Sequence, residues 1–257
     1  MNAARRTSRI PIPTCLILSL ALTGCPLVPP ATDARLEAAF RAAVLDAELA
    51  EPDEICRSLT AITPHEDSLV WEGASGESRV LVVTWTSWTG YDDQVGKSIP
   101  VADLVKSIET ERDTWVTLAP QIQDVCKRLA LNDSRMTLRA EQLLGLPPHD
   151  GKTRFVEFWV DPSDLFRPSP DPAVTDHEAE LDFPGSELFV TVSSEYVDWY
   201  ESQVAISYGP DGYPWTRLGY TYDWGNPLTE VGLSEFVIRT GATVTVKSVT
   251  LNADYWR

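Results

Sequence analysis

Helical spacing of apolar residues recurs in five places along the chain. Over 33–49 an apolar residue returns every three or four positions, so that Leu36, Phe40 and Ala43 would lie on one stripe of a helix. The same spacing predicts helices over 98–108, 120–129, 137–144 and 195–206. In the third of these, Cys126 falls on the apolar face.

Runs of β-branched and aromatic residues predict the strands. The two strong runs are 79–88 and 154–160, and further strands are predicted at 69–71, 114–118, 188–192 and 217–224. The last run, 236–251, is predicted to form a hairpin that turns at Thr240-Gly241. The segment 161–186 contains five prolines and many acids and no regular apolar spacing, so we expect a long loop there.

These elements predict a single α+β domain with a mainly antiparallel sheet and several packed helices. The helices are concentrated in the first half and the predicted hairpin comes last, an order typical of segregated elements. A doubly wound sheet is not expected, because no strand is followed by the Gly-rich turn that binds phosphate at a helix start.

The first 24 residues carry a different pattern. The basic start has three Arg and no acid, and the apolar run 10–22 is about 13 residues long, whereas a bilayer span needs about 20. A basic start, a short apolar run and small residues at its end are typical of a secretory signal peptide.

The end of that run, Leu22-Thr23-Gly24-Cys25, resembles the lipobox of bacterial lipoproteins. The resemblance implies cleavage before Cys25 and a lipid on Cys25, which would anchor the protein to a membrane. Because Pro26 stands where an Asp would favour the inner membrane of Gram-negative relatives, it also implies the outer membrane of a cell envelope. Residues 25–32 would form a Pro-rich tether and 33–257 the globular domain. The alternative is an ordinary signal peptide followed by a chance cysteine.

The charge of the chain excludes some partners. The formal net charge is −17, and removal of the leader would take away three Arg and no acid. Such a surface repels phosphate backbones and anionic headgroups, so we do not expect a nucleic-acid partner. The lipid would be the contact with the membrane.

Two cysteines remain in the predicted mature domain. Cys56 and Cys126 are an even pair in an oxidising compartment, so the sequence predicts a disulfide between them. Two separate thiols are the alternative.

Candidate chemistry is concentrated in an aromatic segment, 208–224, which holds six of the 17 Trp and Tyr. A row of Tyr and Trp rings can stack on sugar faces while neighbouring polar groups contact hydroxyls. The candidate ligand-binding residues are Trp215, Arg217, Tyr220, Tyr222, Asp223 and Trp224. The alternative is that the rings pack beneath the proline-rich loop and fix it.

Acidic residues offer a second kind of chemistry. Glu157, which lies between two aromatic residues on one strand face, and Asp223 and Glu235 are candidates for the carboxylate pair of a glycoside hydrolase, although no motif pairs them. The acids of the 161–186 loop suggest a calcium-binding site, but they lack the residue order and the glycine of a calcium-binding loop. We therefore expect no metal and no cofactor.

Three phrases resemble those of a family of uncharacterised bacterial lipoproteins. They are Leu143-Leu144-Gly145-Leu146-Pro147-Pro148, Asp164-Leu165-Phe166-Arg167-Pro168, and the run from Pro214 to Gly225, PWTRLGYTYDWG. The resemblance implies a secreted, lipid-anchored domain and supplies no catalytic residues. Three hypotheses follow: a non-enzymatic module that binds an envelope glycan or protein, an enzyme acting on envelope polysaccharide, and a structural spacer.

Overall fold

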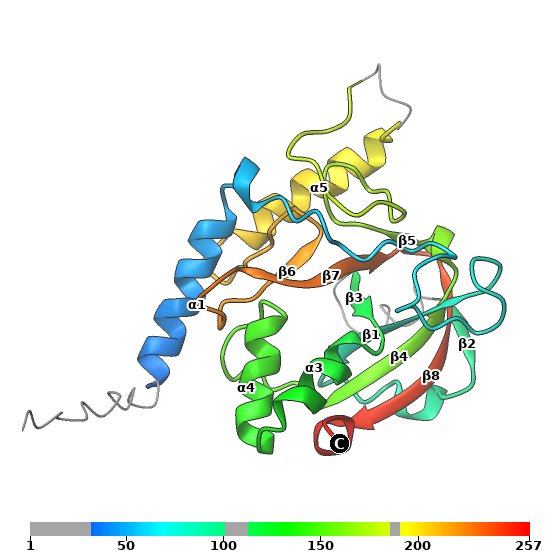
Figure 1. The fold of residues 1–257 in the computed structure, drawn as a ribbon, viewed down its shortest axis with the longest axis horizontal. Coiled ribbons are helices and arrows are strands. Elements are labelled where there is room, and N and C mark those ends of the chain that lie inside the picture. The colour runs from blue at the N-terminus through cyan, green and yellow to red at the C-terminus, as the bar shows by residue number, and fades with distance from the viewer. Residues whose placement is uncertain (1–31, 101–112, 186–190) are drawn as a thin grey trace, which may run out of the picture. The chain divides into compact units, whose positions relative to one another are not determined.

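An antiparallel sheet is the centre of this computed structural model, which describes residues 32–100, 113–185 and 191–257. Its strands are β1 (Val80–Thr86), β2 (Ser98–Pro100), β3 (Thr114–Leu118), β4 (Arg154–Val160), β5 (Leu165–Phe166), β6 (Tyr220–Tyr222), β7 (Val231–Ile238) and β8 (Thr243–Leu251). The order is β2-β8-β4-β1-β3-β7-β5, and β6 pairs with β7 (Figure 1).

The connection between β7 and β8 shows that this sheet curls. Ala242 N donates to Arg239 O at 3.0 Å, and such a turn brings its ends within about 7 Å of one another. In the sheet order, however, β4, β1 and β3 lie between the two strands, and four flat strand spacings would measure about 19 Å. The predicted hairpin at 236–251 is therefore wrong: the turn exists, but its two strands pair with other partners.

The curled sheet encloses the largest core. Residues of β1, β3, β4, β7 and β8 contribute buried side chains to it, among them Val82, Val116, Phe158, Phe236 and Val246. Because side chains alternate along a strand, the other positions of these strands point to the outer face, where helices pack against them.

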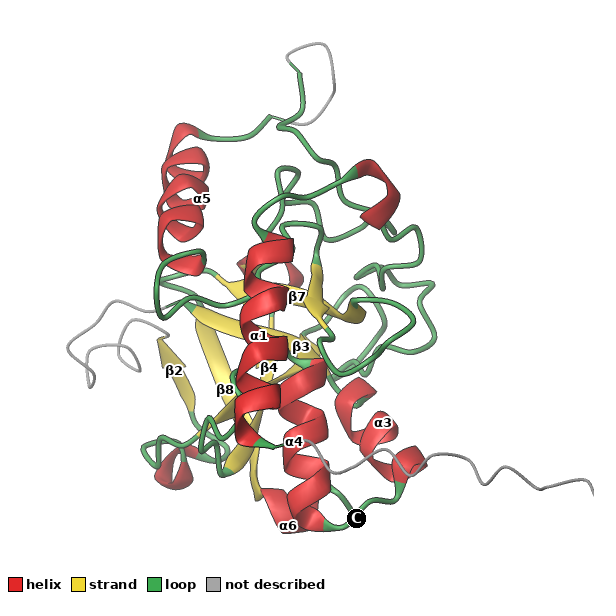
Figure 2. Ribbon diagram, turned by 90° about the vertical axis from the view of Figure 1, so that its left-hand side faces the viewer, coloured by secondary structure: helices red, strands yellow, loops and turns green. Residues whose placement is uncertain are grey.

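Five α-helices lie in the part of the chain that the structure describes. They are α1 (Asp33–Ala47), α3 (Gln121–Leu129), α4 (Asp133–Leu143), α5 (Ser194–Ser207) and α6 (Asn252–Tyr255). Figures 1 and 2 show α3, α4 and α6 grouped below the strands and α5 above them. The first group packs on Leu81, Val83 and Phe155, and α5 packs on Phe166 and Val237.

The predicted α+β class, the antiparallel sheet and the single domain are confirmed, since residues 32–257 form one compact unit. The predicted helices at 33–49, 120–129 and 195–206 are α1, α3 and α5. The helix predicted from 137 begins one turn earlier, because Asn132 caps it by accepting a hydrogen bond from Arg135 N at 3.1 Å.

Other predictions were wrong or lie outside the described residues. Ser98–Pro100 forms a strand on β8 rather than a helix start, and 69–71 supplies only an isolated bridge from Trp71 to Val80. The rest of that helix falls on 101–112 and most of the 188–192 strand on 186–190, both outside the described ranges. The leader, Cys25 and the tether up to residue 31 also lie outside them. None of the helices described is long and apolar enough to cross a membrane.

Candidate functional site

The aromatic segment 208–224 faces inward over much of its length. Trp215, Tyr220 and Asp223 are buried, and the other three predicted ligand-binding residues, Arg217, Tyr222 and Trp224, are half-buried. The strand in this segment, β6, is only three residues long, and the register of its pairing with β7 shifts between Tyr220 and Tyr222. The single row of exposed rings expected from the sequence is therefore not formed.

Trp215 belongs to an aromatic cluster under α5. Its ring centroid lies 5.0 Å from that of Tyr200 and 5.9 Å from that of Trp115, and its Nε1 donates to Pro168 O at 3.1 Å. Both the ring and its polar atom are thus satisfied within the protein, so Trp215 is not free to stack on a ligand.

Three further side chains of the segment hold α1 and the chain after it. Arg217 donates to Glu48 O at 2.6 Å, Tyr220 Oη to Glu54 O at 2.9 Å, and Tyr222 Oη to an Asp46 carboxylate oxygen at 2.6 Å. Trp224 adds an edge-to-face contact with Phe40, with 6.1 Å between ring centroids. The segment therefore attaches the first helix to the sheet.

Asp223 forms a two-point ion pair with Arg139 of α4. One bond, from Nη1 to Oδ1, measures 2.8 Å, and the second joins Nη2 to Oδ2. Asp223 is 2% exposed, so its charge needs this partner. The pair fixes α4 against the chain that follows β6.

The three sequence phrases 143–148, 164–168 and 214–225 meet around β6. Thr221 Oγ1 donates to Leu143 O at 2.7 Å and Trp224 Nε1 to Leu146 O at 2.9 Å, which joins the first phrase to the third. Arg167 Nη1 donates to Gly219 O at 3.4 Å, which joins the second to the third. The phrases therefore form one structural junction.

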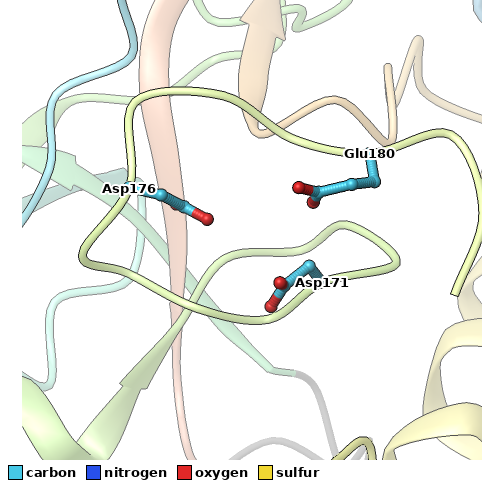
Figure 3. Close-up of side chains that lie close together, drawn as sticks. All are labelled: Asp171, Asp176 and Glu180. Carbon is cyan, nitrogen blue, oxygen red and sulfur yellow. The ribbon is translucent and has the colours of Figure 1, made fainter. Parts of the chain in front are cut away.

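Three acids of the proline-rich loop lie around the buried guanidinium of Arg167. Single oxygens of Asp171, Asp176 and Glu180 lie within 4.8 Å of one another (Figure 3). Arg167 is completely buried, and its Nε lies 3.6 Å from Asp176 Oδ1. Burial raises the pKa of Asp176 and Glu180, and the Arg167 guanidinium opposes that rise at Asp176.

Three carboxylates at this separation could contact a divalent cation, which prefers several oxygen ligands. The guanidinium, however, already supplies a positive charge to the group. Its nitrogens also donate to Ala173 O, Thr60 O and Asp176 O. In this structure the contacts of Arg167 attach the loop to the sheet.

The candidate catalytic acids do not form a pair. Glu157, Val83, Thr117 and Glu235 follow one another in register across β4, β1, β3 and β7. Glu157 and Glu235 thus lie on strands that do not pair, with β1 and β3 between them, whereas the two carboxylates of a glycosidase lie about 5–9.5 Å apart. Glu157 is also bonded to Lys247 at 2.9 Å.

Asp223 is remote from Glu235 as well. Its backbone N–H donates to Glu230 O, and Glu235 lies five residues further along β7, about 16 Å away along an extended strand. Burial raises the pKa of Glu235 to about 8, although its side chain remains partly accessible on β7.

A groove of about 450 Å³ lies between α1 and the loop after β6. One wall is the α1 face of Ala39, Ala42, Ala43 and Asp46, and the opposite wall is the loop 226–230. Tyr222, Asp223 and Trp224 also line it, so three of the six predicted ligand-binding residues meet here. Sequence reasoning missed the α1 wall, whose only signal is a run of Ala at helical spacing beside the apolar stripe.

The two cysteines of the domain are free thiols, so the disulfide predicted between Cys56 and Cys126 is absent from the structure. Cys126 points into the core beneath α3, beside Ile122 and Met136, and burial raises its pKa to about 12. Cys56 packs at the edge of a different cluster, with Leu59 and Leu218, and lines a cavity of about 270 Å³.

Comparison with known proteins adds no relative: no family model, curated protein or solved structure matches this chain.

Proposed function

We propose that the chain is a lipid-anchored protein of the bacterial cell envelope that acts as a non-enzymatic binding module for an envelope glycan or protein. The groove between α1 and the 226–230 loop carries this proposal. It brings together Tyr222, Asp223 and Trp224, and it is large enough for a small ligand or a few side chains of a partner.

Anchoring is supported by the lipobox-like Leu22-Thr23-Gly24-Cys25. A Pro-rich tether of about seven residues reaches only about 20 Å at about 3.1 Å per residue. Because α1 begins at Asp33 and forms one wall of the groove, the binding site would remain close to the membrane.

The non-enzymatic part of the proposal rests on the acids. Glu157 and Glu235 lie on strands that do not pair, and Asp223 and Glu157 are each held by a basic side chain. What the groove offers a ligand is ring edges, small side chains and carboxylates.

The anchor can be tested in a bacterial host by metabolic labelling with a fatty acid and by mass spectrometry of the mature N-terminus. The wild type should carry lipid on Cys25, and Cys25→Ser should carry none. An uncut leader, or a mature end without fatty acid, would remove the envelope assignment.

Binding can be tested by titrating Trp fluorescence with fragments of envelope glycans. A glycan in the groove should change the emission of the wild type, and Trp224→Phe should lose most of that change. Trp88→Phe is the control, because Trp88 is half-buried against Tyr91 and does not line the groove. No response to any glycan would leave a protein ligand or the structural spacer.

A further inference from the structure

The α1 wall of the groove lets another chain approach closely. Ala39, Ala42 and Ala43 project no more than a methyl group, and Asp46 follows one turn later on the same face. The helix is held by Phe40 beneath it and by Tyr222 at Asp46, so this wall is fixed in place.

The opposite wall carries an apolar residue in an exposed position. Leu228 is 91% exposed, although two short turns fix the loop around it. Leu228 N donates to Asn226 Oδ1 and Val231 N donates to Thr229 Oγ1, both at 3.1 Å. A large apolar side chain held in solvent at the rim of a groove is a feature of docking surfaces.

The groove is also negatively charged. Asp46 and Glu230 line it, no Lys or Arg lines it, and neither acid forms an ion pair with any residue of the described ranges. Asp223 beneath them is already paired with Arg139. Beyond the groove, Glu54 has a raised pKa because of burial and because Asp46, Glu230 and Glu51 surround it.

These three features favour one class of occupant. Anionic lipid is repelled, and a neutral glycan would leave the carboxylates without a counter-charge. A basic side chain would find Asp46 and Glu230 within reach while a neighbouring apolar side chain covers Leu228. The net charge of −17 would also accelerate the encounter with a cationic partner.

We propose that the groove docks a short segment of a partner protein that combines basic and apolar side chains. This inference rests on the proposed binding function and specifies its ligand. It makes the envelope partner a protein rather than a glycan.

The experiment uses the full mature chain and a fluorescein-labelled peptide of alternating Lys and Leu, with fluorescence anisotropy as the readout. The same peptide with Glu in place of Lys is the charge control. Binding should be specific to the Lys peptide and should weaken steeply as salt rises from about 0.1 M to about 1 M, which shortens the screening length from about 10 Å to about 3 Å.

Variants locate the site. Ala42→Trp fills the groove and should weaken binding at least about tenfold, the loss typical of a blocked central contact. Ala38→Trp is the matched control, since Ala38 is exposed on the same helix and does not line the groove. Glu230→Gln should also weaken binding, whereas Glu77→Gln, an exposed acid elsewhere, should not.

Two results would overturn the inference: no binding of the Lys peptide, or equal binding by Ala42→Trp and Ala38→Trp. The proposed function is judged separately, by the glycan titration repeated on these two variants. No binding of the Lys peptide, together with a glycan response that is lost only in Ala42→Trp, would keep the binding module and reject the basic segment. Absence of both peptide and glycan binding would reject both proposals.

Discussion

At the scale of single residues, one close approach explains much of the junction around β6. Gly219 has φ +74°, and a Cβ there would lie 2.5 Å from Arg167 Cδ and 3.1 Å from Leu59 Cδ1. Arg167 cannot move aside, because it is completely buried, donates to four carbonyl groups and stacks over Phe236. The backbone at 219 therefore needs both the left-handed conformation and the missing side chain.

Gly219→Ala should lower the free energy of unfolding by about 3 kcal/mol, from strain in the left-handed conformation and overlap with Arg167. Urea denaturation measures the loss. Gly241→Ala is the control: Gly241 also has positive φ, +96°, but a Cβ there meets nothing within 4 Å, so only about 1 kcal/mol should be lost. Equal losses for the two variants would contradict the proposed overlap.

The cysteines offer a second test at this scale. In the native mature chain with Cys25→Ser, a thiol reagent should modify Cys56, which is half-buried at a cavity, and leave Cys126 unmodified. Cys126 is 2% exposed and its raised pKa keeps it as the unreactive thiol. Unfolding in denaturant should release the second thiol. If neither thiol reacts in denaturant without a reductant, a disulfide joins them after all.

At the scale of elements, α1 depends on the aromatic segment for its attachment. Its buried stripe of Leu36, Phe40, Ala43 and Ala47 is short, and the hydrogen bonds from Arg217, Tyr220 and Tyr222 fix its end and the chain beyond it. Residues nearly 200 positions apart thus form the groove together.

Phe40→Ala should loosen this helix. Phe40 is 7% exposed and contacts Trp224, so truncation should cost about 3–4 kcal/mol if α1 and the domain unfold together. If α1 detaches alone, backbone amides of 36–47 should lose hydrogen-exchange protection before those of β1. Leu45→Ala is the control, because Leu45 is 71% exposed on the same helix and should change neither quantity.

Elements with a strong local pattern were predictable from the sequence, and their partners were not. The helices over 33–49 and 195–206 follow from apolar periodicity alone, which depends on neighbours along the chain. The 236–251 run has alternating residues and a good turn, yet curling of the sheet decides that β7 pairs with β3 and β8 with β4.

The candidate site illustrates the same limit. A high density of Tyr and Trp marked 208–224 as unusual, but only tertiary contacts decide whether such rings face solvent or the core. Trp215 and Tyr220 face the core, whereas Tyr222 and Trp224 reach the groove. The run of Ala in α1 and the single Leu228 did not identify a groove in the sequence, because the groove is formed by segments that are distant along the chain.

At the scale of the whole molecule, acids govern how stability responds to pH. Burial raises the pKa of Asp113 and Glu141 above their usual range, and that of Glu235 to about 8. Hydrogen bonds from serines lower the pKa of Glu66 and Asp161. The first group binds protons more tightly in the folded protein and the second group less tightly.

These shifts predict that stability falls as pH rises from about 5 to about 8. Over this window the unfolded chain has released the proton that the folded Glu235 retains, so Glu235 lowers the free energy of unfolding by up to about 1.4 kcal/mol per pH unit. The raised pKa values of Asp113 and Glu141 act in the same direction. The acids with lowered pKa act only below about pH 4, where protonation removes their contribution. Urea denaturation across this range should therefore give the greatest stability near pH 5.

Glu235→Gln keeps the size of the protonated side chain and should flatten the slope of stability against pH, whereas Glu77→Gln at the exposed surface should leave that slope unchanged. A wild-type stability that rises toward pH 8, or equal slopes in wild type and Glu235→Gln, would show that Glu235 is not held protonated inside the fold.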